Sequence, residues 1–296
     1  MTSEVMVFRQ RRRIIRGVDS MNSRTVPSPI AAQAGALVRE WRTTRRLSQL
    51  DLALQAGVSA RHLSCLETGK AQPSREMIVR LAETLDIPLR ERNTLLKAAG
   101  FAPMYPESDL GTPQFAQVRR AIEAILEHQE PYPAFVLDRC WNILMANRAA
   151  ARVNGFLLAG RSSPHANMMR HFFDPNDLRA AVVNWQEVAG DLIRHLHNEA
   201  RTDAKARALL DEVLAYAGVP SRWRTPELSG APSPLLTVVF RHDDRELRFF
   251  STITTFGTPR DVTLDELHIE CTFPVDEPTA QFCRSLARNS TCLPSS

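Results

Sequence analysis

The sequence predicts a multidomain chain in which an all-α five-helix domain is followed by an α+β domain. Two observations predict this fold class. Apolar residues recur at helical spacing through residues 34–100, whereas the final third holds short segments typical of β-strands. The charge divides in the same way: residues 1–100 carry 17 Lys and Arg against 9 Asp and Glu, and the remainder carries 20 against 24. A basic first domain suits a polyanionic partner, and an acidic remainder does not.

The all-α domain is expected over residues 33–101. Its first helix is predicted by the apolar residues Leu37, Val38 and Trp41, and it carries the basic residues Arg39, Arg42, Arg45 and Arg46. Towards its end, helical spacing is kept by Ile78, Leu81, Ala82 and Leu85. Pro88 can start a further helix that ends at Gly100, because proline fits the first turn and glycine the end of a helix.

Residues 48–70 hold the most specific pattern of the chain, two short helices joined by a tight turn. Ser48 and Asp51 have the spacing of a capping box. Gly57 permits the sharp turn, and Ser59 can cap the second helix. One side of the pair is apolar, with Leu52, Ala56, Val58, Leu63 and Leu66. The outward side of the second helix is short, polar and partly basic, as an element that enters the major groove of DNA must be.

An ordinary helical hairpin inside a larger core would also show part of this pattern. The caps, the turn glycine, the small Ala53 and the apolar positions all match together, however. Five helices in this order, over residues 34–100, resemble the Cro/CI-type helix-turn-helix domain of the XRE family of bacterial regulators. In that family a glutamate at the end of the recognition helix, the second helix of the central pair, forms an ion pair with an arginine of the first helix of the domain. The resemblance therefore implies a partly buried structural ion pair between Arg42 and Glu67.

The pattern and the resemblance together predict contacts with double-stranded DNA. Arg61 is the strongest candidate for a base contact, because arginine can donate two hydrogen bonds to guanine. Gln49 is expected to cap the helix before the recognition helix, and the resemblance implies that it meets the DNA backbone or a base edge. The predicted base-reading residues are Gln49, Ala60, Arg61, His62, Ser64 and Cys65. The predicted phosphate-contacting residues are Arg42, Arg45, Arg46, Lys70 and Arg75.

Three segments are expected to lie outside the two domains. Residues 1–32 are basic and polar without periodicity and predict a disordered tail, which is either an arm that tracks DNA or a flexible leader. Met21 is an alternative start of translation. Residues 102–113 are rich in Pro and Gly and predict a linker that separates the two cores. Residues 291–296 form a short tail.

The second domain is expected over residues 114–290. It should begin with a helix over Gln114–Gln129, continue with short strands at Ala134–Leu137 and Trp141–Met145 that turn at Asp138-Arg139, and enter a helix near Asn147. Residues 165–217 read as almost entirely helical. A hairpin turning at Asp243-Asp244, a strand in ELHIECTFPVD and a helix over Pro278–Leu286 complete the expected elements.

Three segments of this domain resemble the MmyB-like ligand-binding domain of bacterial regulators: residues 133–150, 168–175 and 184–196. Residues 225–274 depart from the Gly- and His-containing segment of many members. The resemblance implies a PAS-like fold, a small antiparallel sheet under helices, and an apolar ligand that resembles a fatty acid. Plain core packing is the alternative for each aromatic residue. The predicted pocket residues are Trp141, Met145, Met168, Phe172, Trp185 and Phe249.

Catalysis and metal binding find no support in the sequence. His195 and His197 are two residues apart, and His165 and His171 six apart, so on a helix neither pair shares a face. The five cysteines show no metal spacing, and their odd number favours a reduced compartment. No apolar run reaches the length of a membrane span. We therefore expect neither an enzyme nor a cofactor, and we expect no membrane partner.

The combined interpretation is a bacterial, cytoplasmic, sequence-specific transcription regulator. It is expected to bind double-stranded DNA as a homodimer and to be controlled by a small apolar ligand in its second domain. The main alternative is a DNA-binding regulator whose second domain only mediates dimerisation or partner binding. An enzyme with an appended DNA-binding domain is a third hypothesis, and it lacks a constellation of catalytic residues.

Overall fold

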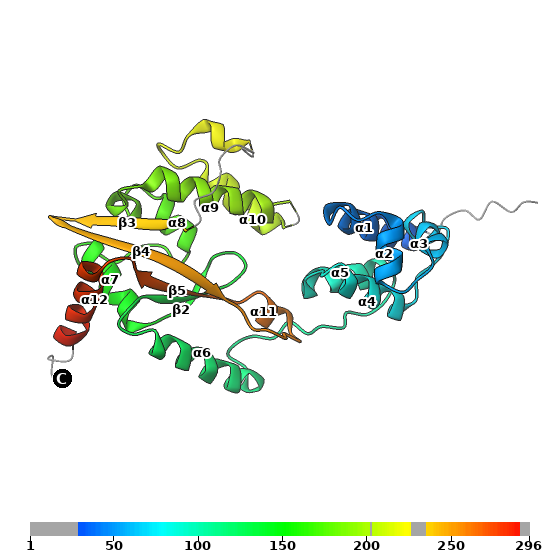
Figure 1. Cartoon of the computed structure of the whole chain (residues 1–296), viewed down its shortest axis with the longest axis horizontal. Coiled ribbons are helices and arrows are strands. Elements are labelled where there is room, and N and C mark those ends of the chain that lie inside the picture. Colours follow the sequence, from blue (N-terminus) through cyan, green and yellow to red (C-terminus); the bar gives the residue numbers. More distant parts are fainter. Residues whose placement is uncertain (1–28, 202, 226–234, 291–296) are drawn as a thin grey trace, which may run out of the picture. The chain divides into compact units, whose positions relative to one another are not determined.

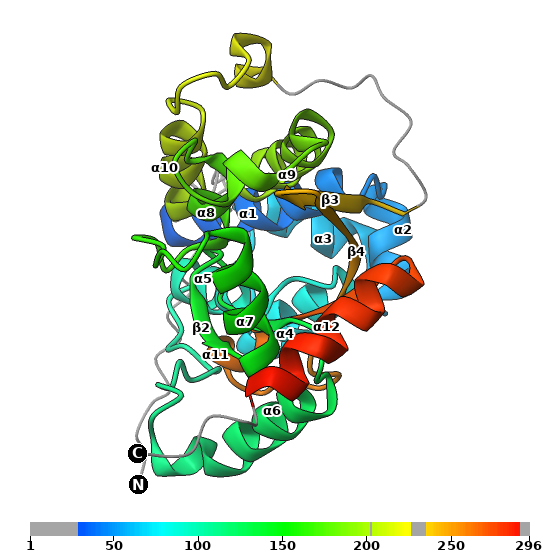
Figure 2. The same cartoon turned by 90° about the vertical axis from the view of Figure 1, so that its left-hand side faces the viewer.

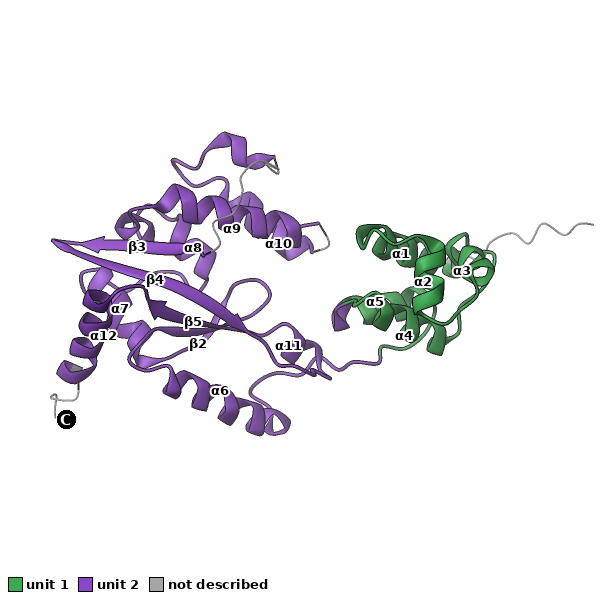
Figure 3. Cartoon of the chain, viewed as in Figure 1, with its two compact units in different colours: residues 1–87, 91–103 green, residues 88–90, 104–296 purple. Residues whose placement is uncertain are grey.

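The computed structural model describes residues 29–201, 203–225 and 235–290. They form two compact units, which Figure 3 colours separately. The first comprises residues up to 87 and 91–103, and the second comprises residues 88–90 and those from 104 onwards. The predicted tail up to residue 28 and the tail over residues 291–296 lie outside the described residues.

The described part of the first unit is helical, as predicted (Figure 1). The caps of its central pair follow the sequence closely. Ser48 and Asp51 form a complete capping box, and the Ser59 side chain accepts a hydrogen bond from the backbone of His62. Gly57 turns the chain with φ +63°, a conformation that glycine adopts at little cost. The helices are α1 (Pro29–Thr44), α2 (Gln49–Gln55), α3 (Ala60–Glu67), α4 (Arg75–Thr84) and α5 (Leu89–Ala98).

The first helix differs from the prediction at both ends. It begins at Pro29, so residues 29–32 of the predicted tail are helical. Small residues allow this first turn to pack against the rest of the unit. Ala31 is buried, and Gly69 lies so close to α1 that a Cβ at Gly69 would be only 2.9 Å from Ala32 Cα. The helix ends at Thr44, which leaves Arg45 and Arg46 in the following turn.

The core of the first unit depends on a close approach of α1 and α3. A Cβ at Gly35 would lie 2.1 Å from the backbone oxygen of Leu66, so only glycine fits this point of α1. Apolar side chains from α2 to α5 complete the core, including the fully buried Leu52, Leu63, Leu66, Ile78, Leu81 and Leu96.

The second unit is built on a five-stranded antiparallel sheet, in the order β2-β1-β5-β4-β3. The hairpin at Asp243-Asp244 and the strand in ELHIECTFPVD are as predicted. The strands are β1 (Ala134–Leu137), β2 (Ile143–Ala146), β3 (Thr237–His242), β4 (Arg245–Thr254) and β5 (His268–Pro274). The last strand in the sequence pairs in the centre of the sheet, between β1 and β4.

Helices cover both faces of this sheet (Figures 1 and 2). One face packs against α6 (Ala116–His128) through Ile122 and Leu126. The other face carries the larger core. The elements on that side include α7 (Arg148–Leu157), α8 (Met168–Phe173), α9 (Trp185–Glu199), α10 (Ala204–Val213) and α12 (Glu277–Ser290). The short α11 (Val262–Asp265) and the 3-10 segments η1 (Pro113–Phe115), η2 (Leu178–Ala181) and η3 (Ser221–Arg224) complete the unit.

Two predictions about connections need correction. The strand expected at Trp141–Met145 begins only at Ile143, because Trp141 has φ +64° and belongs to a turn. The Asp138 carboxylate accepts backbone hydrogen bonds in this turn. The linker expected over residues 102–113 is also not separate from the cores. Pro106 accepts a hydrogen bond from Val262, and Leu110 packs beside the α6 core, so most of this segment belongs to the second unit.

Among the described helices, none combines the length and the apolar composition that crossing a lipid bilayer requires.

Gly35→Ala tests the close approach of α1 and α3. The added methyl group overlaps the Leu66 carbonyl, so we expect a loss of stability of about 1–3 kcal/mol and a lower thermal unfolding midpoint. Gly155→Ala is the matched control, because nothing lies within 4 Å of its added Cβ inside α7. That variant should gain about 0.5–1 kcal/mol. Equal effects of the two substitutions would contradict the proposed packing.

Candidate functional site

The surface of α3 presents the predicted base-reading residues to different degrees. Arg61 and His62 are exposed, while Ala60, Ser64 and Cys65 are half-buried. The helix is short and begins directly at the Ser59 cap, so Arg61 lies in its first turn. Leu63 and Leu66 on the opposite side are buried in the core and fix the orientation of this surface. The arrangement offers exposed hydrogen-bond donors on a rigid helix.

A buried ion pair joins α1 to the end of α3. Arg42 Nε lies 2.6 Å from Glu67 Oε1, and Arg42 Nη2 lies 2.9 Å from Glu67 Oε2. The same guanidinium donates to the Leu47 backbone oxygen at 2.8 Å. This is the pairing that the family resemblance implied.

Gln49 extends the ion pair to α2. Its Nε2 donates to Glu67 Oε2 at 2.7 Å, whereas Ser48 is the residue that caps the helix. The expected capping role of Gln49 is therefore wrong, since its amide is directed to Glu67. Burial by itself raises the pKa of the Glu67 carboxyl, but hydrogen bonds from Arg42 and Gln49 outweigh burial and hold this pKa below its usual value. Glu67 is thus charged, and both of its carboxylate oxygens accept hydrogen bonds inside the fold.

The predicted phosphate-contacting residues fall into two groups. Arg42 is only 9 % exposed and serves the ion pair, so its guanidinium does not face solvent. Arg45 donates to the backbone oxygens of Leu85 and Asp86 and is partly committed to the fold. The exposed remainder of the predicted set is Arg46, Lys70 and Arg75.

An apolar cavity of about 70 Å³ lies in the second unit, between the sheet and the helices on its larger core. Met168, Phe172 and Phe249 of the predicted pocket line it. Ser251 also lines it and is exposed, so the cavity is reached from the second half of β4. The other lining residues are Pro133, Phe135, Val153, Asn154, Leu157, Leu178, Val238, Phe240, Glu270 and Thr272.

Three predicted pocket residues do not line this cavity. Met145 packs on the opposite face of the sheet, beside α6. Trp185 is directed into the helical core, where its indole donates to the Phe172 backbone oxygen at 2.6 Å. Trp141 lies in the turn before β2, and its indole donates to Glu199 at 3.1 Å. The sequence did not reveal which face each aromatic residue would take.

Glu270 is an ionisable cavity residue that the sequence reasoning missed. It follows the alternation of β5, in which Ile269 and Cys271 face the α6 core and Glu270 and Thr272 face the cavity. Alternation alone would have placed Glu270 on a solvent face. Burial raises the pKa of its carboxyl, and a hydrogen bond with Ser251 offsets only part of that rise.

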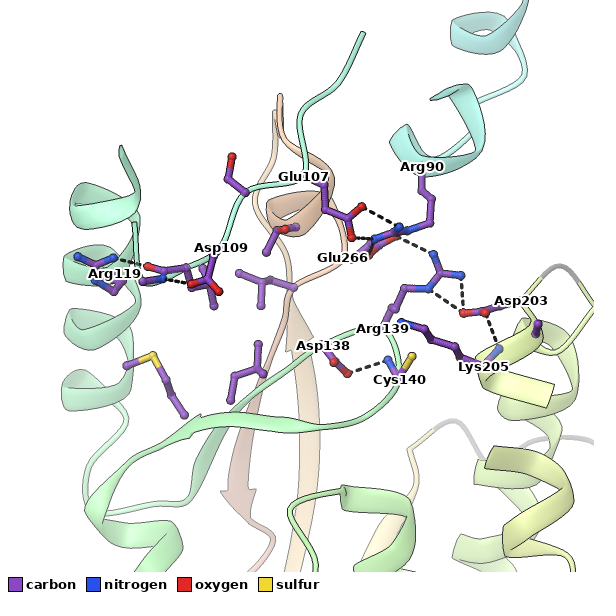
Figure 4. Close-up of a pocket in the computed structure, with 18 residues that line it drawn as sticks. Arg90, Glu107, Asp109, Arg119, Asp138, Arg139, Cys140, Asp203, Lys205 and Glu266 are labelled. Carbon is purple, nitrogen blue, oxygen red and sulfur yellow. Dashed lines mark hydrogen bonds and ion pairs between the residues drawn. The ribbon is translucent and has the colours of Figure 1, made fainter. Parts of the chain in front are cut away.

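A larger and more open groove of about 960 Å³ is lined by apolar and charged side chains (Figure 4). Several of these charges are paired: Arg139 donates to Glu266 at 2.8 Å and also to Asp203. Cys140 lies beside them, and burial raises the pKa of its thiol. A raised pKa keeps the thiol protonated, which argues against a nucleophilic role. Met145 lines this groove instead of the apolar cavity.

Two neighbouring histidines of the second unit pair with carboxylates. His165 and His171 lie together, with ring centroids 6.3 Å apart, although the sequence spacing predicted different faces. That prediction was wrong because His165 precedes α8 and is not on a helix. His165 contacts Asp174 at 2.8 Å, and His171 contacts Asp177 at 3.2 Å. Within the described residues, no three His, Cys, Asp or Glu side chains are arranged to hold a metal ion.

Two family profiles match the chain. The profile described as "MmyB-like transcription regulator ligand binding domain" matches residues 118–286, more than half of the chain. The profile described as "Helix-turn-helix" matches residues 38–92. The two matches fall on the second and the first unit respectively, apart from residues 88–90.

Solved structures similar to part of the chain include the restriction-modification controller protein C.AhdI from Aeromonas hydrophila. It is 35% identical over 21% of this chain and 94% of its own, with a TM-score of 0.20. The clp gene regulator ClgR from C. glutamicum is 26% identical over 26% of this chain and 96% of its own, with a TM-score of 0.22. Because both TM-scores are low, neither carries a structural argument. A search of curated protein sequences found no match.

Glu67→Ala tests the buried ion pair. Removing the carboxylate leaves the Arg42 charge uncompensated inside the fold, so we expect a loss of about 3–5 kcal/mol of stability, measured by denaturant unfolding. The pair should also shape acid stability. Because the folded pKa of Glu67 is lowered, its contribution is present above the ordinary pKa of 4.5 and is lost as pH falls through the folded value.

Glu83→Ala is the matched control, since the Glu83 side chain is exposed on α4. Its stability should stay within about 0.5 kcal/mol of the wild type. The double variant Arg42→Met with Glu67→Leu should recover part of the loss, because no buried charge remains. Strictly additive losses in the double variant would disprove the coupling.

Proposed function

Because the chain belongs to the transcription regulators that carry an MmyB-like ligand-binding domain behind an XRE-type helix-turn-helix, we propose that α3 reads a DNA sequence under the control of an apolar ligand. As a member of that family it is a DNA-binding transcription regulator. The observation that carries the finer proposal is the apolar cavity between the sheet and α7 and α8, lined by a few polar groups.

In the proposed DNA complex, α3 enters the major groove with its first turn. Arg61 is exposed there and can donate two hydrogen bonds to a guanine, while His62, Ser64 and Cys65 flank it. Arg46, Lys70 and Arg75 are exposed and can neutralise phosphates. Gln49 and Arg42 act indirectly, since both hold Glu67 at the end of the recognition helix.

We propose that two copies bind one operator. A single helix-turn-helix covers only a half-site, and two copies about 34 Å apart read successive major grooves. The first unit is small and basic, so two copies of it repel each other. The second domain is therefore the better candidate for the dimer contact.

The cavity limits the size of the proposed ligand. Its volume of about 70 Å³ is roughly half that of an apolar cavity of about 150 Å³ that binds benzene. A short aliphatic chain fits it best, and a longer chain requires its walls to move. Met168 is a flexible wall residue that can adapt to such a chain. Entry from the exposed side of β4 avoids unfolding of the core.

A ligand in the cavity controls DNA binding only if it favours one state of the protein over another. A coupling of about 1–3 kcal/mol would change operator affinity by roughly 5- to 150-fold. The alternative is that the second domain only mediates dimerisation or partner binding and senses nothing. Mass spectrometry of an organic extract of the purified protein separates the two, because the alternative predicts no ligand in stoichiometric amount.

Arg61→Ala tests sequence reading. We expect it to lose about 1–3 kcal/mol of preference for an operator selected from random DNA, while binding to random DNA changes little. Arg46→Ala should instead weaken both kinds of DNA alike and reduce the salt dependence by about one unit of slope. Fluorescence anisotropy at several salt concentrations measures both quantities.

Arg80→Ala is the control for these variants, because Arg80 is exposed on α4 and is not among the predicted contacts. It should leave affinity and preference unchanged. An equal loss on operator and random DNA for Arg61→Ala would refute its assignment as a base-reading residue.

Val153→Phe tests ligand control by filling the cavity from α7. In the wild type, we expect operator affinity to change about 5- to 150-fold when bound apolar material is extracted. In Val153→Phe this change should vanish, since the added ring occupies the space. Ala151→Leu, at an exposed position of the same helix, should behave as the wild type. If the wild type keeps one affinity before and after extraction of a detected ligand, the second domain is an assembly module.

A further inference from the structure

Of the described residues that line the cavity, Glu270 on β5 is the one with an ionisable side chain. Its neighbours across the sheet are Phe135 on β1 and Ile253 on β4, and neither can pair with a charge. The helical side of the cavity adds apolar and neutral groups, among them Val153, Asn154 and Phe172. Glu270 therefore faces the proposed ligand without an ionic partner from any element that lines the cavity.

The Glu270 carboxyl hydrogen-bonds with the hydroxyl of Ser251 on β4. Among the described residues, no Arg, Lys or His forms an ion pair with it. Glu270 is half-buried, and burial raises the pKa of its carboxyl above the ordinary value of 4.5. A carboxyl in such a place favours the neutral form, which can both donate and accept a hydrogen bond.

We propose that the cavity selects an apolar ligand whose neutral polar end, a hydroxyl or an amide, hydrogen-bonds to Glu270 and Ser251, and that it discriminates against carboxylates. The wall supplies two kinds of group for such an end: the Glu270 carboxyl and the Ser251 hydroxyl each donate and accept. The apolar remainder of the ligand lies against Phe135, Val153 and Phe249. This inference rests on the proposed function, because it names the ligand class of the same cavity.

A ligand carboxylate fits this wall poorly for an electrostatic reason. A ligand carboxylate brings a charge into an apolar cavity, and burying an unpaired charge costs far more than burying a hydrogen-bonded neutral group. A fatty acid has an ordinary carboxyl pKa similar to that of glutamate, and at pH 7.5 only about one molecule in a thousand is neutral. Among the described residues that line the cavity, none carries a positive charge to compensate the ligand carboxylate. A hydroxyl carries none of these costs.

The experiment compares two probes of equal chain length, 1-hexanol and hexanoate, on the full-length protein at pH 7.5. Protein-observed NMR titration measures both dissociation constants. We expect hexanol to bind at least about tenfold more tightly than hexanoate. In Glu270→Gln the ratio should change little, since the amide is neutral like the protonated carboxyl and keeps both a donor and an acceptor. In Glu270→Leu, hexanol binding should weaken about tenfold, because its hydrogen-bond partner is lost.

Glu123→Gln is the matched control. Glu123 is exposed on α6, which covers the opposite face of the sheet, so this variant should leave both dissociation constants unchanged. The comparison within the wild type requires no variant to fold. Hexanoate binding as tightly as hexanol would overturn this inference and leave the proposed ligand cavity standing. Binding of neither probe, to the wild type or to Glu270→Gln, would overturn both.

Discussion

The sheet of the second unit is covered by helices on both faces, and the arrangement of that unit follows from this constraint. Strand β1 is buried along its whole length, and β5 lies in the centre of the sheet between β1 and β4. Each central strand must therefore supply apolar groups to two separate cores. Glu270 is an exception, since a carboxyl takes a position where the packing calls for an apolar group. A polar group kept in such a position points to a function that requires it.

The first unit depends on a different interaction, the charged contact of Arg42, Gln49 and Glu67. It joins α1, α2 and the end of α3 at one point, and Gly35 brings the α1 and α3 backbones close enough for it to form. The negative charge of Glu67 is neutralised within the fold, so it does not oppose the approach of phosphates to α3. Stability and electrostatic suitability for a polyanion thus come from one contact.

The first unit could be predicted well because its signals are local. The capping box at Ser48, the turn at Gly57 and the cap at Ser59 are each set by neighbours in the sequence, and so is the hairpin turn at Asp243. The cavity could be predicted only in part. Met145 was assigned to the wrong face and Glu270 was not identified, because strand order, which decides the face, is set by distant pairing of β5. The Pro- and Gly-rich composition of residues 102–113 likewise did not reveal that the Pro106 backbone oxygen accepts a hydrogen bond from the Val262 amide.

The division of α3 between its two sides also has an evolutionary consequence. Leu63, Leu66 and Glu67 are fixed by the core, whereas Arg61 and His62 have exposed side chains that the core does not need. Substitutions at the exposed positions leave the fold unchanged, so their cost in stability is small. Duplicated copies of such a gene can therefore acquire new binding preferences by a few mutations, without a compensating change elsewhere. The same property makes α3 a suitable segment for randomised libraries in directed evolution.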